Sequence, residues 1–174
     1  MEYGRLIVAL ATPFRPDLEV DYDKTAELAR RLVAEGATAF VSAGTTGESP
    51  TLSREERIEL VKTLKKAVRV PIIANVGTND TRASIRNAKD AEEAGADGLL
   101  LVVPYYNKPD QGMLFDHFKA IAESVKIPSM LYNVPGRTAA SVRPETVVKL
   151  SREVPNIRYV KEASGDLEAL TQIV

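Results

Sequence analysis

The sequence predicts an α/β fold, a (β/α)₈ barrel of the TIM type, and three observations lead to it. Apolar segments typical of strands buried on both faces alternate with amphipathic helical segments along the chain. Successive strands are about 30 residues apart, which is the spacing of β/α units. No G-x-G-x-x-G motif follows the first strand, and polar residues follow several strands rather than one. This distribution favours the barrel over an open doubly wound sheet.

The expected strands are short and continuously apolar. They are predicted to begin near residues 6, 38, 71, 97, 128 and 157. A weak internal repeat supports a chain built from successive β/α units, because Gly36-Ala37 before the second strand recurs as Gly95-Ala96 before the fourth. We expect one domain over residues 1–174, containing the first six strands and five to six helices of the barrel.

Helix-start signals occupy the segments between the strands. Ser53 followed by Glu56 predicts a capping box, in which each side chain accepts a hydrogen bond from the backbone N–H of the other residue. The next signals along the chain are Asp80 with Thr81, Pro144 and Asp166. An apolar stripe at helical spacing is formed by Leu114, Phe118, Ile121 and Val125.

Composition excludes several classes of function. With 23 Lys and Arg against 24 Asp and Glu, the chain has no broad basic surface for nucleic acid. The absence of cysteine excludes thiolate nucleophiles, disulfides and Cys-based zinc sites. The single histidine, His117, is interpreted as a surface or edge residue. The longest apolar run, residues 99–103, is too short for a membrane span, and we expect a cytoplasmic protein.

Lys161 at the end of the sixth strand is the most informative residue. Regular alternation would place Ile157, Tyr159 and Lys161 on one face, so an inward Ile157 implies an inward amine. Loss of hydration lowers the pKa of an amine, and a neutral amine can form a Schiff base with a ketone. The alternative is a structural ion pair with Glu162. Tyr132, which ends the neighbouring strand, is either a proton relay or an ordinary core aromatic.

Three further segments follow strands. Residues 44–47 form a Gly-Thr-Thr-Gly turn whose N–H groups and hydroxyls suit a small carboxylate, although a tight turn before a helix would need the same residues. Arg137 is able to bind a second carboxylate through two parallel hydrogen bonds, or it is simply solvated. Tyr106 lies in an aromatic loop that is either functional or a packing element.

Taken together, four segments resemble the dihydrodipicolinate synthase family of pyruvate-dependent class I aldolases. They are residues 44–51, 104–109, 132–138 and 161–166. The resemblance implies a lyase that condenses pyruvate with L-aspartate 4-semialdehyde to 4-hydroxy-tetrahydrodipicolinate in lysine (diaminopimelate) biosynthesis. It also implies that no metal or organic cofactor takes part and that the enzyme is a homo-oligomer, a dimer or a tetramer.

The same resemblance implies a role for each motif residue. Lys161 would form the pyruvate Schiff base. The proton relay would consist of Tyr132, Thr45 and Tyr106, the last donated across a subunit interface. Substrate carboxylates would be held by Gly44 and Thr46 for pyruvate and by Arg137 for the semialdehyde.

Two alternatives and two departures from the family pattern accompany this interpretation. A 2-keto-3-deoxy sugar acid aldolase is disfavoured by Arg137, and an inactive half-barrel with a structural role is disfavoured by the retained reactive residues. Residues 75–77 read Asn-Val-Gly where the family usually has Gly-Thr-Gly, and Arg54, Arg57 and Ala83 argue against feedback inhibition by lysine. Eight units need roughly 240 residues. We therefore expect a barrel truncated on its C-terminal side that self-associates unless it is completed.

Overall fold

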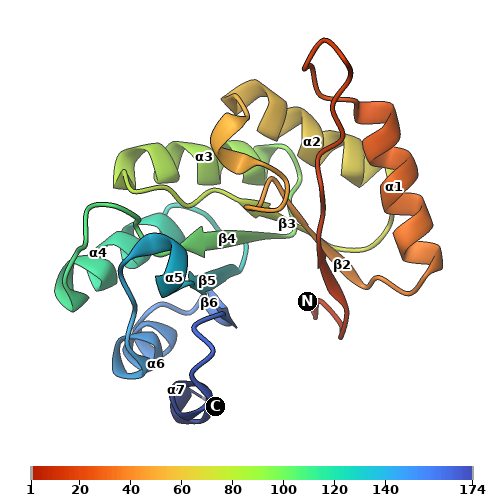
Figure 1. The fold of residues 1–174 in the computed structure, drawn as a ribbon. Helices are drawn as coiled ribbons and strands as arrows, with labels where there is room; N and C mark the ends of the chain where they lie inside the picture. Colours follow the sequence, from red (N-terminus) through yellow and green to blue (C-terminus); the bar gives the residue numbers. More distant parts are fainter. Residues whose placement is uncertain (1, 174) are drawn as a thin grey trace. The chain divides into compact units, whose positions relative to one another are not determined.

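Strands and helices alternate along residues 2–173, the part of the chain that the computed structural model describes (Figure 1). The strands are β1 (Ile7–Ala9), β2 (Ala39–Ser42), β3 (Ile72–Asn75), β4 (Gly98–Val102), β5 (Ser129–Asn133) and β6 (Ile157–Glu162). The helices are α1 (Tyr22–Ala34), a 3₁₀ turn η1 (Ser49–Thr51), α2 (Arg54–Ala67), α3 (Thr81–Glu93), α4 (Gln111–Ala122), α5 (Pro135–Thr138), α6 (Pro144–Glu153) and α7 (Leu167–Ile173). Every strand begins within one residue of its predicted start. The order of elements and the parallel pairing described below confirm the predicted fold class.

The chain forms two compact units. One contains the residues up to Asn75 together with Asp90–Gly98, and the other contains Val76–Lys89 together with the residues from Leu99 onward. That all of these residues form a single domain stays a prediction.

In the first unit, β1, β2 and β3 pair in parallel and bury one apolar core. The register places Val8 beside Phe40 and Phe40 beside Ile72. Phe40, Leu64 and Ile72 have no exposed surface, and they form a cluster with residues of α1 and with Leu10. Burying a large apolar side chain contributes about 1.5–3 kcal/mol. This cluster therefore fixes α1 and α2 against the sheet that carries the 44–47 turn.

Helix α2 forms where its predicted capping box lies. Ser53 Oγ accepts a hydrogen bond from the Glu56 N–H at 3.2 Å, and the Glu56 carboxylate accepts one from the Ser53 N–H at 2.7 Å. Lys65 near the C-terminal end of the helix pairs with Asp97 at 2.7 Å, and Asp97 also accepts a hydrogen bond from the Ile72 N–H at 2.8 Å. One carboxylate therefore ties α2 to the start of β3.

In the second unit, β4, β5 and β6 pair in parallel beside the predicted stripe of α4. Leu114, Phe118 and Ile121 of this stripe are fully buried. Helix α6 begins at Pro144, as predicted, and Gln111 of α4 accepts hydrogen bonds from residues at the start of this helix. The Gln111 Oε1 atom accepts hydrogen bonds from the backbone N–H of Arg143 at 2.9 Å and from the hydroxyl of Thr146 at 2.8 Å.

The register of β6 corrects the alternation argument made from the sequence. Ser129 pairs with Ile157, but the next residue, Met130, pairs with Tyr159, so β6 contains a β-bulge at Arg158. Paired residues of parallel strands lie on the same face of a sheet, and consecutive residues lie on opposite faces. Ile157 and Tyr159 therefore lie on opposite faces, and the prediction that Ile157 and Lys161 share a face is wrong.

The bulge leaves two groups of side chains on this sheet. The face called here the Tyr132 face carries Leu100, Val102, Met130, Tyr132, Tyr159 and Lys161. The opposite face, called the Leu131 face, carries Leu99, Leu101, Ser129, Leu131, Asn133, Ile157, Val160 and Glu162. Lys161 therefore shares a face with Tyr132. This follows from the pairing of β5 with β6, whereas the spacing between Ile157 and Lys161 does not predict it.

The interpretation of His117 as a surface or edge residue is also wrong. His117 is only 6% exposed, its ring lies edge-on to Phe118, and its Nδ1 atom is hydrogen-bonded to the Thr81 hydroxyl at 2.8 Å. Burial lowers the pKa of His117 from 6.5 to about 4, and the nearby Asp80 carboxylate opposes this shift. The ring is therefore a neutral component of the contact between α3 and α4.

This burial predicts a pH dependence of stability. The unfolded chain binds a proton at His117 near pH 6.5 and the folded chain near pH 4, so protonation favours unfolding between these values. We expect the free energy of unfolding to fall by up to about 3 kcal/mol as the pH falls through this window, and to lose no more from His117 below it. Urea unfolding between pH 4 and 7.5 measures this change.

The control for this prediction is His117→Gln, which cannot titrate. Carboxylates also titrate in the acidic part of the window, so the difference between the two proteins isolates the histidine. Parallel pH profiles for the two proteins would show that His117 is not responsible.

Among residues 2–173 no helix has the length and apolar character needed to cross a bilayer. Within the same range, no group of three or more His, Cys, Asp or Glu side chains is arranged to hold a metal ion.

Candidate active site

Lys161 and Tyr132 are the two predicted site residues that the second unit brings into contact. They are direct partners across β5 and β6, near the carboxyl end of each strand. The Lys161 Nζ atom lies 4.3 Å from the centroid of the Tyr132 ring. Tyr132 is 8% exposed and Lys161 is partly buried. The phenol therefore forms one wall of the environment of the amine.

Burial makes the neutral form of the Lys161 amine easier to reach than that of a solvated lysine. Burial lowers the pKa of the Lys161 amine from its ordinary value of 10.5. The alternative ion pair with Glu162 is not what the structure shows, because the Glu162 carboxylate accepts hydrogen bonds from Asn133 Nδ2 at 2.9 Å and from the Ser164 N–H at 2.8 Å. Glu162 also lies on the Leu131 face. The geometry therefore suits a nucleophilic amine more than a structural one.

Asn133, which was not among the predicted site residues, joins the ends of β5 and β6. It is 3% exposed, and its Oδ1 atom accepts hydrogen bonds from the Ser141 hydroxyl and the Val142 N–H, both at 3.2 Å. Its backbone carbonyl accepts a third from the Ala163 N–H at 2.9 Å. Through Glu162 and these contacts, Asn133 connects the end of β6 to the segment that follows α5.

Arg137 lies in α5, the short helix that follows β5. No helix was predicted in this segment, but Pro135 begins a single helical turn there. The turn ends at Ala139, which has a φ of 55°, and the buried Thr138 hydroxyl donates to the Ala140 carbonyl at 2.7 Å. Arg137 itself is exposed, so its guanidinium is available for an anionic ligand.

Tyr106 lies in the loop after β4 in an uncommon backbone conformation. Its φ is 72°, and the Asn107 N–H donates to the Tyr105 carbonyl at 2.8 Å, which makes Tyr106 the central residue of a three-residue γ-turn. Its side chain is 88% exposed. The structure therefore places Tyr106 on the surface of its unit and does not bring it into contact with Lys161.

In the first unit, residues 44–47 form the predicted turn after β2. The Gly47 and Ser49 N–H groups both donate to the Gly44 carbonyl, at 3.0 and 3.1 Å. A Cβ atom at Gly47 would lie 2.8 Å from the carbonyl oxygen of Leu10, so only glycine fits there. Thr45 and Thr46 are exposed at the tip of the turn. The backbone of the turn is held by these hydrogen bonds, and its two threonines are accessible to a ligand.

Asn75, the first residue of the Asn-Val-Gly segment that departs from the family pattern, is hydrogen-bonded to residues on both sides of the 44–47 turn. Its Nδ2 atom donates to the Ala43 carbonyl at 3.0 Å and to the Ser49 hydroxyl at 2.9 Å. Asn75 is 8% exposed and stands at the end of β3. The last residue of β3 therefore supports the 44–47 turn from both sides.

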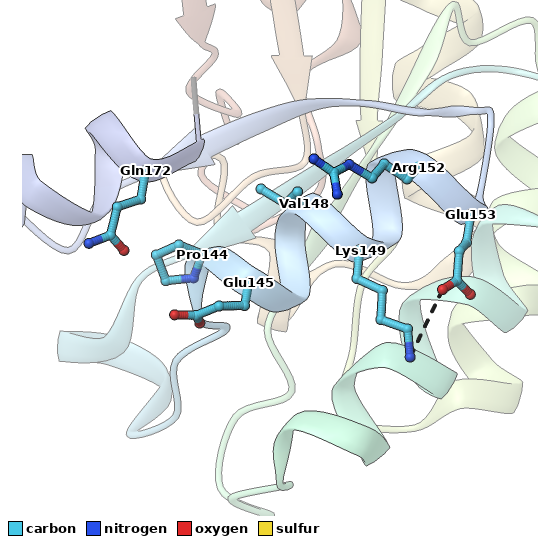
Figure 2. A pocket seen from close by; sticks show the side chains of 7 residues that line it. All are labelled: Pro144, Glu145, Val148, Lys149, Arg152, Glu153 and Gln172. Carbon is cyan, nitrogen blue, oxygen red and sulfur yellow. Dashed lines mark ion pairs between the residues drawn. The ribbon is translucent and has the colours of Figure 1, made fainter.

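A groove on the second unit lies apart from these residues. It is formed by α6 and α7, has a volume of about 520 Å³ and contains the Lys149–Glu153 ion pair at 4.0 Å (Figure 2). Its lining consists of Pro144, Glu145, Val148, Lys149, Arg152, Glu153 and Gln172. None of the candidate site residues lines it.

Comparison with known proteins agrees with these motifs. A sequence model of the Dihydrodipicolinate synthetase family matches residues 2–174. The 4-hydroxy-tetrahydrodipicolinate synthase of Bacillus subtilis (strain 168) is 52% identical over 176 residues, covering 100% of this chain and 61% of its own.

Solved structures share the fold over nearly the whole chain. The crystal structure of a dihydrodipicolinate synthase from Bacillus anthracis has a TM-score of 0.97 at 47% identity, covering 99% of this chain and 60% of that one. The chloride-inhibited enzyme of Acinetobacter baumannii, complexed with pyruvate, has a TM-score of 0.93 at 44% identity, covering 97% and 58%. The chain thus spans about 60% of the length of the relatives that it matches.

Proposed function

Because the chain belongs to the dihydrodipicolinate synthetase family, we propose that it acts as a 4-hydroxy-tetrahydrodipicolinate synthase, condensing pyruvate with L-aspartate 4-semialdehyde. The observation that carries this proposal is the partly buried Lys161 amine, whose pKa is lowered, 4.3 Å from the ring of Tyr132. Such an amine is a nucleophile toward a ketone, and a phenol near it is a group that both donates and accepts protons.

The reaction begins at Lys161. Its neutral amine attacks C2 of pyruvate, and the adduct loses water to give an imine. Loss of a proton from the methyl carbon gives an enamine, whose carbon attacks the aldehyde carbon of the second substrate. The amino group of that substrate then replaces Lys161 at C2, which closes the ring and frees the enzyme. One pyruvate and one semialdehyde give the product and one water.

Protein side chains supply proton transfer and anion binding in this scheme. Tyr132 exchanges protons with the adduct, together with Thr45 and with Tyr106 of a second subunit. Gly44 and Thr46 hold the pyruvate carboxylate, and Arg137 binds the carboxylate of the semialdehyde. The 88% exposure of Tyr106 supports its donation to a neighbouring subunit, and hence a homo-oligomer. A cytoplasmic location is part of the same proposal and rests on the family alone.

Incubation with both substrates tests the proposed function. We expect pyruvate and the semialdehyde to be consumed in equal amounts, and we expect no cleavage of a 2-keto-3-deoxy sugar acid supplied in their place. Cleavage of the sugar acid without condensation of the first pair would establish the alternative aldolase. If neither reaction occurs although the chain is folded, the proposal is wrong.

A further inference from the structure

We propose that Asn107 is a positioning residue, which holds Tyr106 in its strained turn by clasping Asn79, two residues before α3. The clasp consists of the hydrogen bonds between Asn107 and Asn79. This inference rests on the proposed function, because the purpose of the clasp is to present the Tyr106 hydroxyl for proton transfer.

The backbone at Tyr106 needs something to hold it. A γ-turn with positive φ is rare and strained, and residues in sparsely populated conformations cost about 1–3 kcal/mol unless their surroundings enforce them. Lys108, two residues later, also has a positive φ of 48°. With 88% of its surface exposed, the Tyr106 side chain contributes almost no packing that could offset this cost.

Asn107 supplies the restraint through both ends of its side-chain amide. Its Nδ2 atom donates to the backbone carbonyl of Asn79 at 2.9 Å, and its Oδ1 atom lies 3.4 Å from Asn79 Nδ2. The Asn107 N–H is the donor that closes the γ-turn. One residue therefore closes the turn with its backbone and anchors it with its side chain.

Asn79, to which the Asn107 side chain is bonded, is itself held in place by its neighbours. The Thr78 N–H donates to the Ser84 hydroxyl at 2.9 Å, and the Asp80 N–H donates to the Thr78 hydroxyl at 3.1 Å. The Asp80 carboxylate caps α3 by accepting from the Arg82 N–H at 2.8 Å. Asn79 lies between these two restrained residues, so its carbonyl has a defined position relative to α3.

Asn107→Asp tests the clasp, because it keeps the shape of the side chain, removes the Nδ2 donor and places a negative charge beside the Asn79 carbonyl. We expect hydrogen exchange of the residue 107 amide, measured by NMR, to accelerate about tenfold, as the loss of one hydrogen bond predicts. We expect kcat to fall by a similar factor while KM for pyruvate changes little. Asn79→Ala, which removes only the longer contact and keeps the carbonyl, should have the smaller effect on both measurements.

A double-mutant cycle distinguishes positioning from a general structural role. If Asn107 acts through Tyr106, Asn107→Asp should cause no further loss of kcat in a Tyr106→Phe background. Additive losses, or an unchanged exchange rate in Asn107→Asp, would overturn the proposal. If the unmodified chain condenses no substrate, the proposed function fails, while the exchange rates still decide whether Asn107 holds the turn.

Discussion

Lys161→Ala should abolish the mass increase that pyruvate and borohydride produce in the unmodified protein. Borohydride reduces an imine to a stable amine, so every molecule that forms the imine becomes permanently labelled at the reacting lysine. Removal of the only reacting amine should leave no label, and intact-protein mass spectrometry measures this directly. The rate of labelling should rise with pH and level off below the ordinary lysine pKa of 10.5, because the pKa of Lys161 is lowered by burial.

Two variants make this experiment decisive. Lys161→Arg keeps a positive charge near Tyr132 but offers no reactive amine, so it should fold and remain unlabelled. Lys62→Ala removes an exposed lysine of α2 and should label like the unmodified protein. Labelling of a folded Lys161→Ala protein at another lysine would contradict the assignment.

Arg137→Ala should impair use of the semialdehyde far more than imine formation with pyruvate. A hydrogen bond to a charged group contributes about 1.5–3 kcal/mol, which corresponds to roughly tenfold to a hundredfold in kcat/KM for the second substrate. Steady-state kinetics with the semialdehyde varied, together with borohydride labelling by pyruvate, separates the two steps.

The matched control for Arg137 is Arg143→Ala. Arg143 is exposed on the segment after α5, and the structure uses its backbone N–H, bonded to Gln111, to begin α6. This variant should retain both steps. Equal damage to both steps by Arg137→Ala would instead mean that Arg137 supports the short helix rather than the substrate.

Elements specified by local sequence were predicted well. The capping box of Ser53 and Glu56, the start of α6 at Pro144 and the cap of α7 at Asp166 depend on residues within one turn, and all three are present. Helix α5 was missed because a Val-Pro-Gly-Arg segment has the composition of a turn. The burial of His117 was missed because it depends on Thr81, 36 residues away in the chain.

The residues of the candidate site also differ in how far the sequence predicts them. The contact of Lys161 with Tyr132 follows from two strand ends that the apolar pattern locates, so sequence reasoning could bring these residues together. Asn133 and Asn107 were overlooked because the partners of their side chains are 29 and 28 residues away in the chain. The roles of Thr45, Thr46 and Gly44 stay predictions.

Because of the β-bulge in β6, the effect of a one-residue deletion on the orientation of the Lys161 amine depends on where in the strand the residue is lost. Ile157 and Lys161 are four residues apart and would face the same way in a regular strand, yet they lie on opposite faces. A deletion at Arg158 would remove the bulge and leave a regular strand with both orientations preserved. A deletion between Tyr159 and Lys161 would instead reverse the amine relative to Tyr132. A one-residue deletion in β6 should therefore keep the amine beside Tyr132 at the start of the strand but not near its end.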